Sequence, residues 1–260
     1  EDKLMAETSD LAPHAASLIM KLMYGARMAG PHLITIISKT SSRITKWTKD
    51  DDRRLHRVYC YPFGAINLTL HGCLSTADLD EIVIVEWPDA DFCGDATTTR
   101  STSGYFLEIQ GREGRSFPIG WGSKKQGATA RHTSEAETIS LASCLSMEAI
   151  PVQQLVQSIM RRAVELKVME DNMATIISIN KGYSPSLRSL KRHHKVSLGF
   201  LHEAVNDERD DEGEGKIKLM KAATVEHKGD MFTKELDIPK FQAALTMIKM
   251  YQDDRVDKQK

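Results

Sequence analysis

The sequence predicts a mixed α/β fold that follows a smaller, mainly helical segment. Up to about residue 57, apolar residues recur at the spacing of amphipathic helices. From residue 80 onward, three short runs of β-branched and aromatic residues are separated by turn-rich segments. Beyond residue 133, helical patterns alternate with further short strands. Strands followed by strands interleaved with helices are typical of a layered α/β domain.

The helical segment contains three expected helices. The first begins near residue 9 and is broken by Gly30-Pro31, and residues 32–44 repeat the amphipathic pattern. Residues 48–57 place a capping Thr and acids before bases, which predicts a helix start. Residues 59–77 contain Pro and Gly and suit short strands or a connector.

The α/β part begins with three expected strands in an antiparallel meander. Gly111 starts a hairpin loop, and the strands cover residues 82–87, 104–110 and 117–123. A helix over residues 133–149 follows, and we expect Pro151 to break or kink it before its apolar stripe continues to residue 163. The remaining expectations are strands at 166–170 and 216–222, helices at 172–181, 189–206, 230–236 and 239–251, and a solvated acidic loop at 207–215.

Composition excludes several classes of protein. The chain has 260 residues, 41% of them hydrophobic, which is enough for a substantial core and one to two domains. A net charge of −1 excludes a uniformly basic binder, and four scattered cysteines make a disulfide framework or zinc site unfavourable. We therefore expect a reducing intracellular setting, either cytoplasm or nucleus. The absence of a signal peptide and of a run of about 18 apolar residues predicts no membrane partner. Because the first residue is Glu1, we expect a piece of a longer chain.

Acidic residues gather where the first strand of the meander ends. Asp89 and Asp91 follow the β-branched run IVIV, and two carboxylates in one place repel each other unless a proton, a cation or water relieves them. We do not place Asp91 or Asp95 in a metal site, because they can be turn residues or acids that face a nucleic acid.

Six motifs resemble one known family when they are taken together. The segments PDADFCGD, RSTSGY, WGSKKQ, TSEAETISL, EDN and DMFTKEL occur in the order found in the ribonuclease H domain of Ty1/copia-type retrotransposon Pol polyproteins. The resemblance covers about residues 80–250, and MAGPHL and DDRRLHRVYCY extend it into the segment after the family's polymerase. It implies a ribonuclease H-like mixed five-stranded sheet with flanking helices over 80–252, a thumb or connection segment of a reverse transcriptase over 1–79, and a polar tail over 253–260.

The resemblance also implies a catalytic site and a substrate. Asp89, Glu137, Asp171 and Asp230 match the four acids that bind metal and carry catalysis. Magnesium prefers a few carboxylates, and two ions roughly 4 Å apart can activate water and stabilise a leaving oxygen. We expect two Mg²⁺ ions, with Mn²⁺ not distinguished, and hydrolysis of the RNA strand of an RNA–DNA hybrid duplex. The polymerase part of a parent polyprotein is the expected protein partner.

Each acid also has a structural interpretation. Glu137 follows a serine by three residues, so it can complete a capping box, and Glu135 is its rival for the site. Asp171 can be part of a helix N-cap, and Asp230 can be an acid favoured at a helix start.

Basic and hydroxyl residues form candidate nucleic-acid contacts, with turns and solvated surfaces as the alternatives. Residues 181–202 contain five Lys or Arg, three His and no acid, which favours contact with a duplex backbone. His227 is expected to be a surface residue or to assist product release. The candidate contacts are Arg100, Ser101, Lys124, Lys125, Arg188, Lys191, Arg192 and Lys195.

Departures from the family leave a second function open. Lys195 stands where the family has an acid, Thr138 stands where it has an aromatic residue, and Phe92 stands where it has tryptophan. Pro151 falls in a helix that the family keeps continuous. The alternative function is a non-catalytic remnant that binds hybrid or a partner protein. Only a nuclease predicts metal-dependent cleavage that is lost in Asp89→Asn with folding intact.

Overall fold

The computed structural model describes residues 9–95, 98–206 and 215–253 in two compact units. One unit comprises Glu1–His71 with Ile238–Lys260, and the other comprises Gly72–Asp237. We expected residues 80–252 to form one domain, whereas residues 238–252 group with the N-terminal helices. Residues 207–214 of the acidic loop expected at 207–215, and residues 254–260 of the polar tail expected at 253–260, lie outside the described residues.

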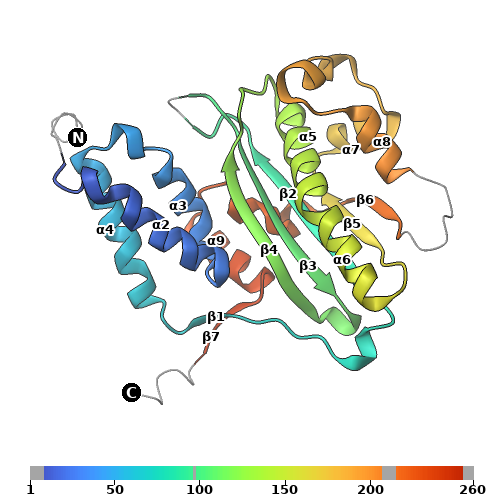
Figure 1. The fold of residues 1–260 in the computed structure, drawn as a ribbon, viewed down its shortest axis with the longest axis horizontal. Helices are drawn as coiled ribbons and strands as arrows, with labels where there is room; N and C mark the ends of the chain where they lie inside the picture. Colours follow the sequence, from blue (N-terminus) through green and yellow to red (C-terminus); the bar gives the residue numbers. More distant parts are fainter. Residues whose placement is uncertain (1–8, 96–97, 207–214, 254–260) are drawn as a thin grey trace. The chain divides into compact units, whose positions relative to one another are not determined.

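The first unit is built from helices, as its apolar spacing predicts (Figure 1). A capping box joins Thr48 to Asp51 at the start of the third helix, where the sequence predicted a helix start. That helix continues past its expected end, and Pro62 lies in its last turn. The elements are α2 (Ala12–Met28), α3 (Ile34–Ser41), α4 (Lys49–Gly64), β1 (Leu68–Leu70), α9 (Ile238–Met247) and β7 (Met250–Gln252), with β1 and β7 antiparallel.

The second unit contains a five-stranded mixed sheet in the order β4-β3-β2-β5-β6. The antiparallel meander is confirmed, and the last two strands run parallel to the first of it. This order and these directions are those of the ribonuclease H-like fold. The strands are β2 (Val83–Asp91), β3 (Thr102–Gln110), β4 (Ser116–Lys125), β5 (Leu166–Glu170) and β6 (Ile217–Lys221).

A long helix runs along the sheet (Figure 1). It consists of α5 (Thr133–Cys144), a π-helical turn (Leu145–Ala149) and α6 (Ile150–Met160). The helix does not break at Pro151. A π turn lies directly before the proline, with Ile150 N–H donating to the Leu145 carbonyl oxygen, and the helix continues beyond it. These 28 residues are long and apolar enough to cross a membrane by composition alone, but a helix that packs on a sheet satisfies the same criterion.

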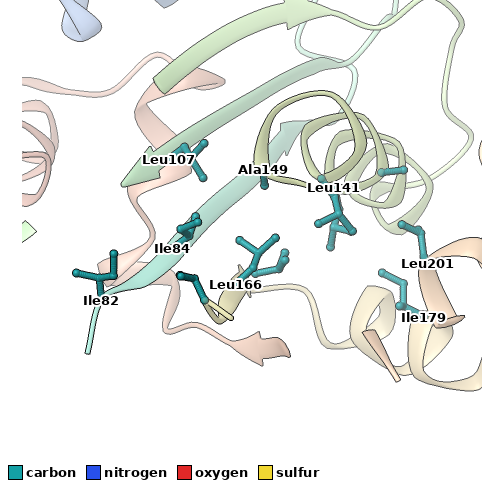
Figure 2. Packing of buried hydrophobic residues seen from close by; sticks show 12 residues of the cluster. Ile82, Ile84, Leu107, Leu141, Ala149, Leu166, Ile179 and Leu201 are labelled. Carbon is teal, nitrogen blue, oxygen red and sulfur yellow. The ribbon is translucent and has the colours of Figure 1, made fainter. Parts of the chain in front are cut away.

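Buried aliphatic residues join the helices to the sheet (Figure 2). Ile84 and Leu166 of the strands pack with Leu141 of α5. Ile179 of α7 (Met173–Lys181) and Leu201 of α8 (Leu198–Val205) complete this core. Since burial of one such side chain contributes roughly 1.5–3 kcal/mol, this core holds the long helix against the sheet.

Two expected helices are shorter than predicted. Residues 189–206 form a π turn (Leu190–His194) and α8, because Lys195 adopts a left-handed φ of 61° that ends the first turn. Residues 230–236 give only the end of a 3-10 turn, Lys228–Phe232.

Candidate metal centre

Asp89 lies at the centre of the site, within β2 and not beyond its end. Its side chain is 1% exposed, and in the sheet Asp89 lies opposite Gly104 of β3. The 3-10 turn 228–232 packs closely here, since a Cβ on Gly104 would lie 2.6 Å from Thr233 and a Cβ on Gly229 would lie 2.8 Å from the Asp89 Cβ. Ser140 of α5 donates a hydrogen bond of 2.6 Å to the Asp89 carbonyl oxygen. Strand, helix and turn therefore meet at one carboxylate.

The other three predicted acids converge on this carboxylate. Ligand atoms of Asp89, Glu137 and Asp171 lie within 4.8 Å of one another. Ligand atoms of Asp89, His227 and Asp230 do the same. Asp89 belongs to both groups, so two three-ligand clusters share one aspartate.

Glu137, and not Glu135, faces the cluster. His132 is the N-cap of α5, and its Nδ1 accepts a hydrogen bond from Glu135 N–H. Glu135 accepts hydrogen bonds from Arg131 N–H at 2.7 Å and from the Ser189 hydroxyl at 2.8 Å. The capping-box interpretation of Glu137 is therefore wrong: the acid at the helix start is Glu135.

The strand end that carries Asp171 adds an acid that the sequence analysis missed. Asn172 is the N-cap of α7, since its Oδ1 accepts from Ala174 and Thr175 N–H, so the cap does not use the Asp171 carboxylate. Glu170 is 1% exposed. The alternation of β5, with residues 166, 168 and 170 all buried, could have revealed it.

The electrostatics of the cluster disfavour full ionisation. Burial, with repulsion from Asp89 and Glu170, raises the pKa of Glu137 to about 10. Burial raises the pKa of Glu170 to about 8 despite its hydrogen bond from Asn172 N–H. Burial and then Asp89 raise the pKa of Asp230. Hard oxygen ligands with excess negative charge are the donor set that Mg²⁺ prefers, so these residues fit a divalent cation.

His227 is buried, so its expected surface position is wrong. It is 1% exposed and packs edge-on against Trp87, with the ring centroids 5.7 Å apart. Its Nε2 lies 2.9 Å from the Met169 carbonyl oxygen, which can only accept, so Nε2 carries the hydrogen. The buried Nδ1 has no hydrogen-bond partner among the described residues, which leaves a nitrogen lone pair near Asp89 and Asp230.

Three further residues in or just after the 3-10 turn 228–232 contact the site or pack beside it, and the sequence analysis did not predict them. Lys228 forms an ion pair with the fully buried Glu108, and its ammonium lies 5.4 Å from the centroid of the Trp87 ring. Thr233 donates a hydrogen bond to Asp89 Oδ2. Lys234 Nζ lies 2.6 Å from Asp230 Oδ1 and 3.2 Å from Asp89 Oδ1. The only signal in the sequence for this region was the DMFTKEL motif.

The candidate contacts from RSTSGY and WGSKKQ lie at the same end of the sheet as Asp89. Lys125 pairs with Thr102, two residues from the Gly104 that pairs with Asp89. Arg100 and Lys124 are exposed, whereas Lys125 forms an ion pair with Asp95. Ser101 is fully buried and its hydroxyl accepts from Cys93 N–H, as the turn interpretation predicted. Its place as a phosphate contact is therefore wrong.

The basic segment is exposed and is attached to the start of α5. Arg131 donates to the Ser186 carbonyl oxygen at 3.0 Å and to the Ser189 hydroxyl at 2.5 Å. A groove of about 200 Å³ between α7 and α8 is lined in part by Tyr183 and Ser197. The exposed candidate contacts here are Arg188, Lys191, Arg192 and Lys195.

The sheet order and the acidic cluster define a ribonuclease H-like domain. The chain is distantly homologous to a segment of the Pol polyproteins of copia-type transposons. It is 26% identical over 237 residues to the retrovirus-related Pol polyprotein from transposon TNT 1-94 of Nicotiana tabacum, covering 91% of this chain and 16% of that protein. It is 25% identical over 213 residues to the Pol polyprotein from transposon RE1 of Arabidopsis thaliana, covering 82% of this chain and 13% of that protein. No family model matches the chain.

Two solved structures are similar at low identity. Ribonuclease H1 from Halobacterium salinarum aligns with a TM-score of 0.37 and 14% identity, covering 58% of this chain and 93% of that one. The protease–reverse transcriptase of prototype foamy virus aligns with a TM-score of 0.32 and 14% identity, covering 70% of this chain and 22% of that one.

Proposed function

We propose that this chain is the ribonuclease H part of a retrotransposon Pol polyprotein and hydrolyses the RNA strand of RNA–DNA hybrids endonucleolytically. The observation that carries the proposal is the convergence of four acids from distant segments on one end of the sheet. Such a cluster is electrostatically unfavourable without cations, because its carboxylates repel one another. Binding of divalent cations would relieve this repulsion.

The residues divide into two candidate ligand sets. Asp89, Glu137 and Asp171 would hold one Mg²⁺, and Asp89, Asp230 and His227 would hold a second cation, for which Mn²⁺ is also suitable. Bound cations would supply Lewis-acid activation of water and stabilise the leaving oxygen. The chain's own contribution is to fix Asp89 through Thr233 and to bury the Asp89 and Glu137 carboxylates away from bulk water.

The substrate follows from the exposed basic surface. Arg100 and Lys124 flank the acidic end of the sheet, and Lys191 and Arg192 lie on the segment tied to the start of α5. Lys and Arg that contact phosphates supply sequence-independent affinity, while the 2′-hydroxyl and groove shape distinguish a hybrid from DNA. We further propose residues 1–79 as a thumb or connection segment, a reverse transcriptase as partner, and the cytoplasm or nucleus as location.

A non-catalytic hybrid-binding role is the alternative. The exposed basic segment favours it, because that surface can bind a duplex whether or not the acids hold metal. Metal-dependent cleavage separates the two functions.

The deciding experiment is cleavage of an end-labelled RNA–DNA hybrid by the purified chain with Mg²⁺. We expect internal cuts in the RNA strand, none with EDTA, and a loss of at least about 100-fold in Asp89→Asn, because both cation sites lose a ligand. Asp91→Asn is the matched control, since Asp91 lies on the same strand outside both ligand groups. Hybrid binding without cutting by the folded chain would overturn the nuclease and support the binding module.

A further inference from the structure

Lys234 of the DMFTKEL motif contacts the acids directly, although the proposed function assigns roles only to Asp230 and Thr233 of that motif. Thr233 donates to Asp89 Oδ2, and Lys234 Nζ lies within hydrogen-bond distance of both Asp89 Oδ1 and Asp230 Oδ1. Lys234 therefore bridges Asp89 and Asp230, the two carboxylates of the second ligand set.

We propose that the Lys234 ammonium and a divalent cation compete for the Asp89–Asp230 carboxylate pair, so that binding of the second cation requires the lysine to leave. This inference rests on the proposed metal site and deepens it, since it makes the two cation sites unequal.

The distances support competition and not coexistence. The ammonium is 2.6 Å from Asp230 Oδ1 and 3.2 Å from Asp89 Oδ1. A Mg²⁺ ion bound by the same oxygens would sit about 2.1 Å from each, in the space that the ammonium occupies. Two cations that close also repel each other strongly in a partly buried site.

The lysine has a route out of the site. Its side chain is 36% exposed, and it lies four residues after Asp230, just beyond the 3-10 turn. A flexible four-carbon stem can move the ammonium into solvent while the turn stays in place.

The other ligand set meets this lysine only through the shared Asp89. Among the described residues, no hydrogen bond or ion pair joins a lysine to the Glu137 or Asp171 carboxylate, and Lys221 contacts the Asp171 carbonyl oxygen instead. The first cation is therefore expected at Asp89, Glu137 and Asp171, and the weaker second cation at Asp89, His227 and Asp230.

Calorimetric titration of the purified chain with Mn²⁺ alone tests this order. Lys234→Met should tighten the weaker site by about tenfold or more, because a charge-assisted hydrogen bond no longer has to be broken. Lys234→Arg keeps the charge and should keep the weak site weak. Lys218→Met, which removes a lysine paired with Glu165, is the control and should change neither site.

The outcomes separate this inference from the metal site itself. Two Mn²⁺ sites in the parent with unchanged or weakened affinity in Lys234→Met would overturn competition and leave the metal site standing. No Mn²⁺ binding by the parent would overturn both.

A measurement on the unaltered chain covers the case in which Lys234→Met does not fold. In protein with ¹⁵N-labelled lysine, a protected ammonium signal that is absent from Lys234→Arg should move to the solvent-exposed position on saturation with Mg²⁺. A signal that stays unchanged at saturation would overturn the competition.

Discussion

Glu137→Gln should make the metal-free protein more stable at neutral pH while it weakens cation binding. Folding buries Glu137 beside other acids and raises its pKa from 4.5 to about 10. Between these values the folded chain holds a proton that the unfolded chain releases, so the free energy of unfolding falls as pH rises. Glutamine has the same shape and carries no such proton.

The size of the effect follows from the pH interval. When the folded state binds one proton more than the unfolded state, the free energy of unfolding falls by about 1.4 kcal/mol per pH unit. Between pH 5 and pH 7 the largest possible loss is therefore about 3 kcal/mol. Neighbouring acids share the proton, and we expect about 1–3 kcal/mol. The Glu170 carboxyl, with its pKa raised to about 8, adds a slope of the same sign in both proteins.

Urea unfolding from pH 5 to pH 8 in EDTA measures this difference, with Asp91→Asn as the control. Saturating Mg²⁺ should then reverse the order, because a cation that binds only the folded state stabilises the parent more than the variant. Parallel pH profiles for the parent and Glu137→Gln, or a variant that is less stable at pH 7, would refute the placement of Glu137 in a crowded buried cluster.

Two other substitutions test the parts around the centre. Lys191→Gln with Arg192→Gln should weaken hybrid binding uniformly across sequences and lower the slope of log affinity against log salt by about 1 per charge, measured by fluorescence anisotropy. An unchanged slope would remove this segment from the interface. Lys228→Met should cost about 3–5 kcal/mol in urea unfolding, because it leaves the buried Glu108 carboxylate unpaired. The paired change with Glu108→Leu should recover most of that loss, and no recovery would contradict the role assigned to the ion pair.

The sequence by itself determined the elements and the identity of the candidate acids. Period-two and helical spacing located β2, β3, β4 and β5 and the long helix within a few residues, because a half-buried face imposes its period on the chain. The order of six motifs selected Asp89, Glu137, Asp171 and Asp230. The expected break at Pro151 does not occur, because a π turn before the proline keeps the helix continuous.

Only the tertiary structure decided which polar groups meet. Glu135 and Glu137 are two residues apart, and the contact of Glu135 with Ser189 of a distant segment determines which of them faces Asp89. His227 was expected at the surface because no local sequence pattern indicates that it packs against Trp87. Lys234 contacts Asp89 because the 3-10 turn before it packs on β2. The spacing of residues along a chain predicts its faces, whereas the charge balance of a site depends on contacts between segments that are distant in sequence.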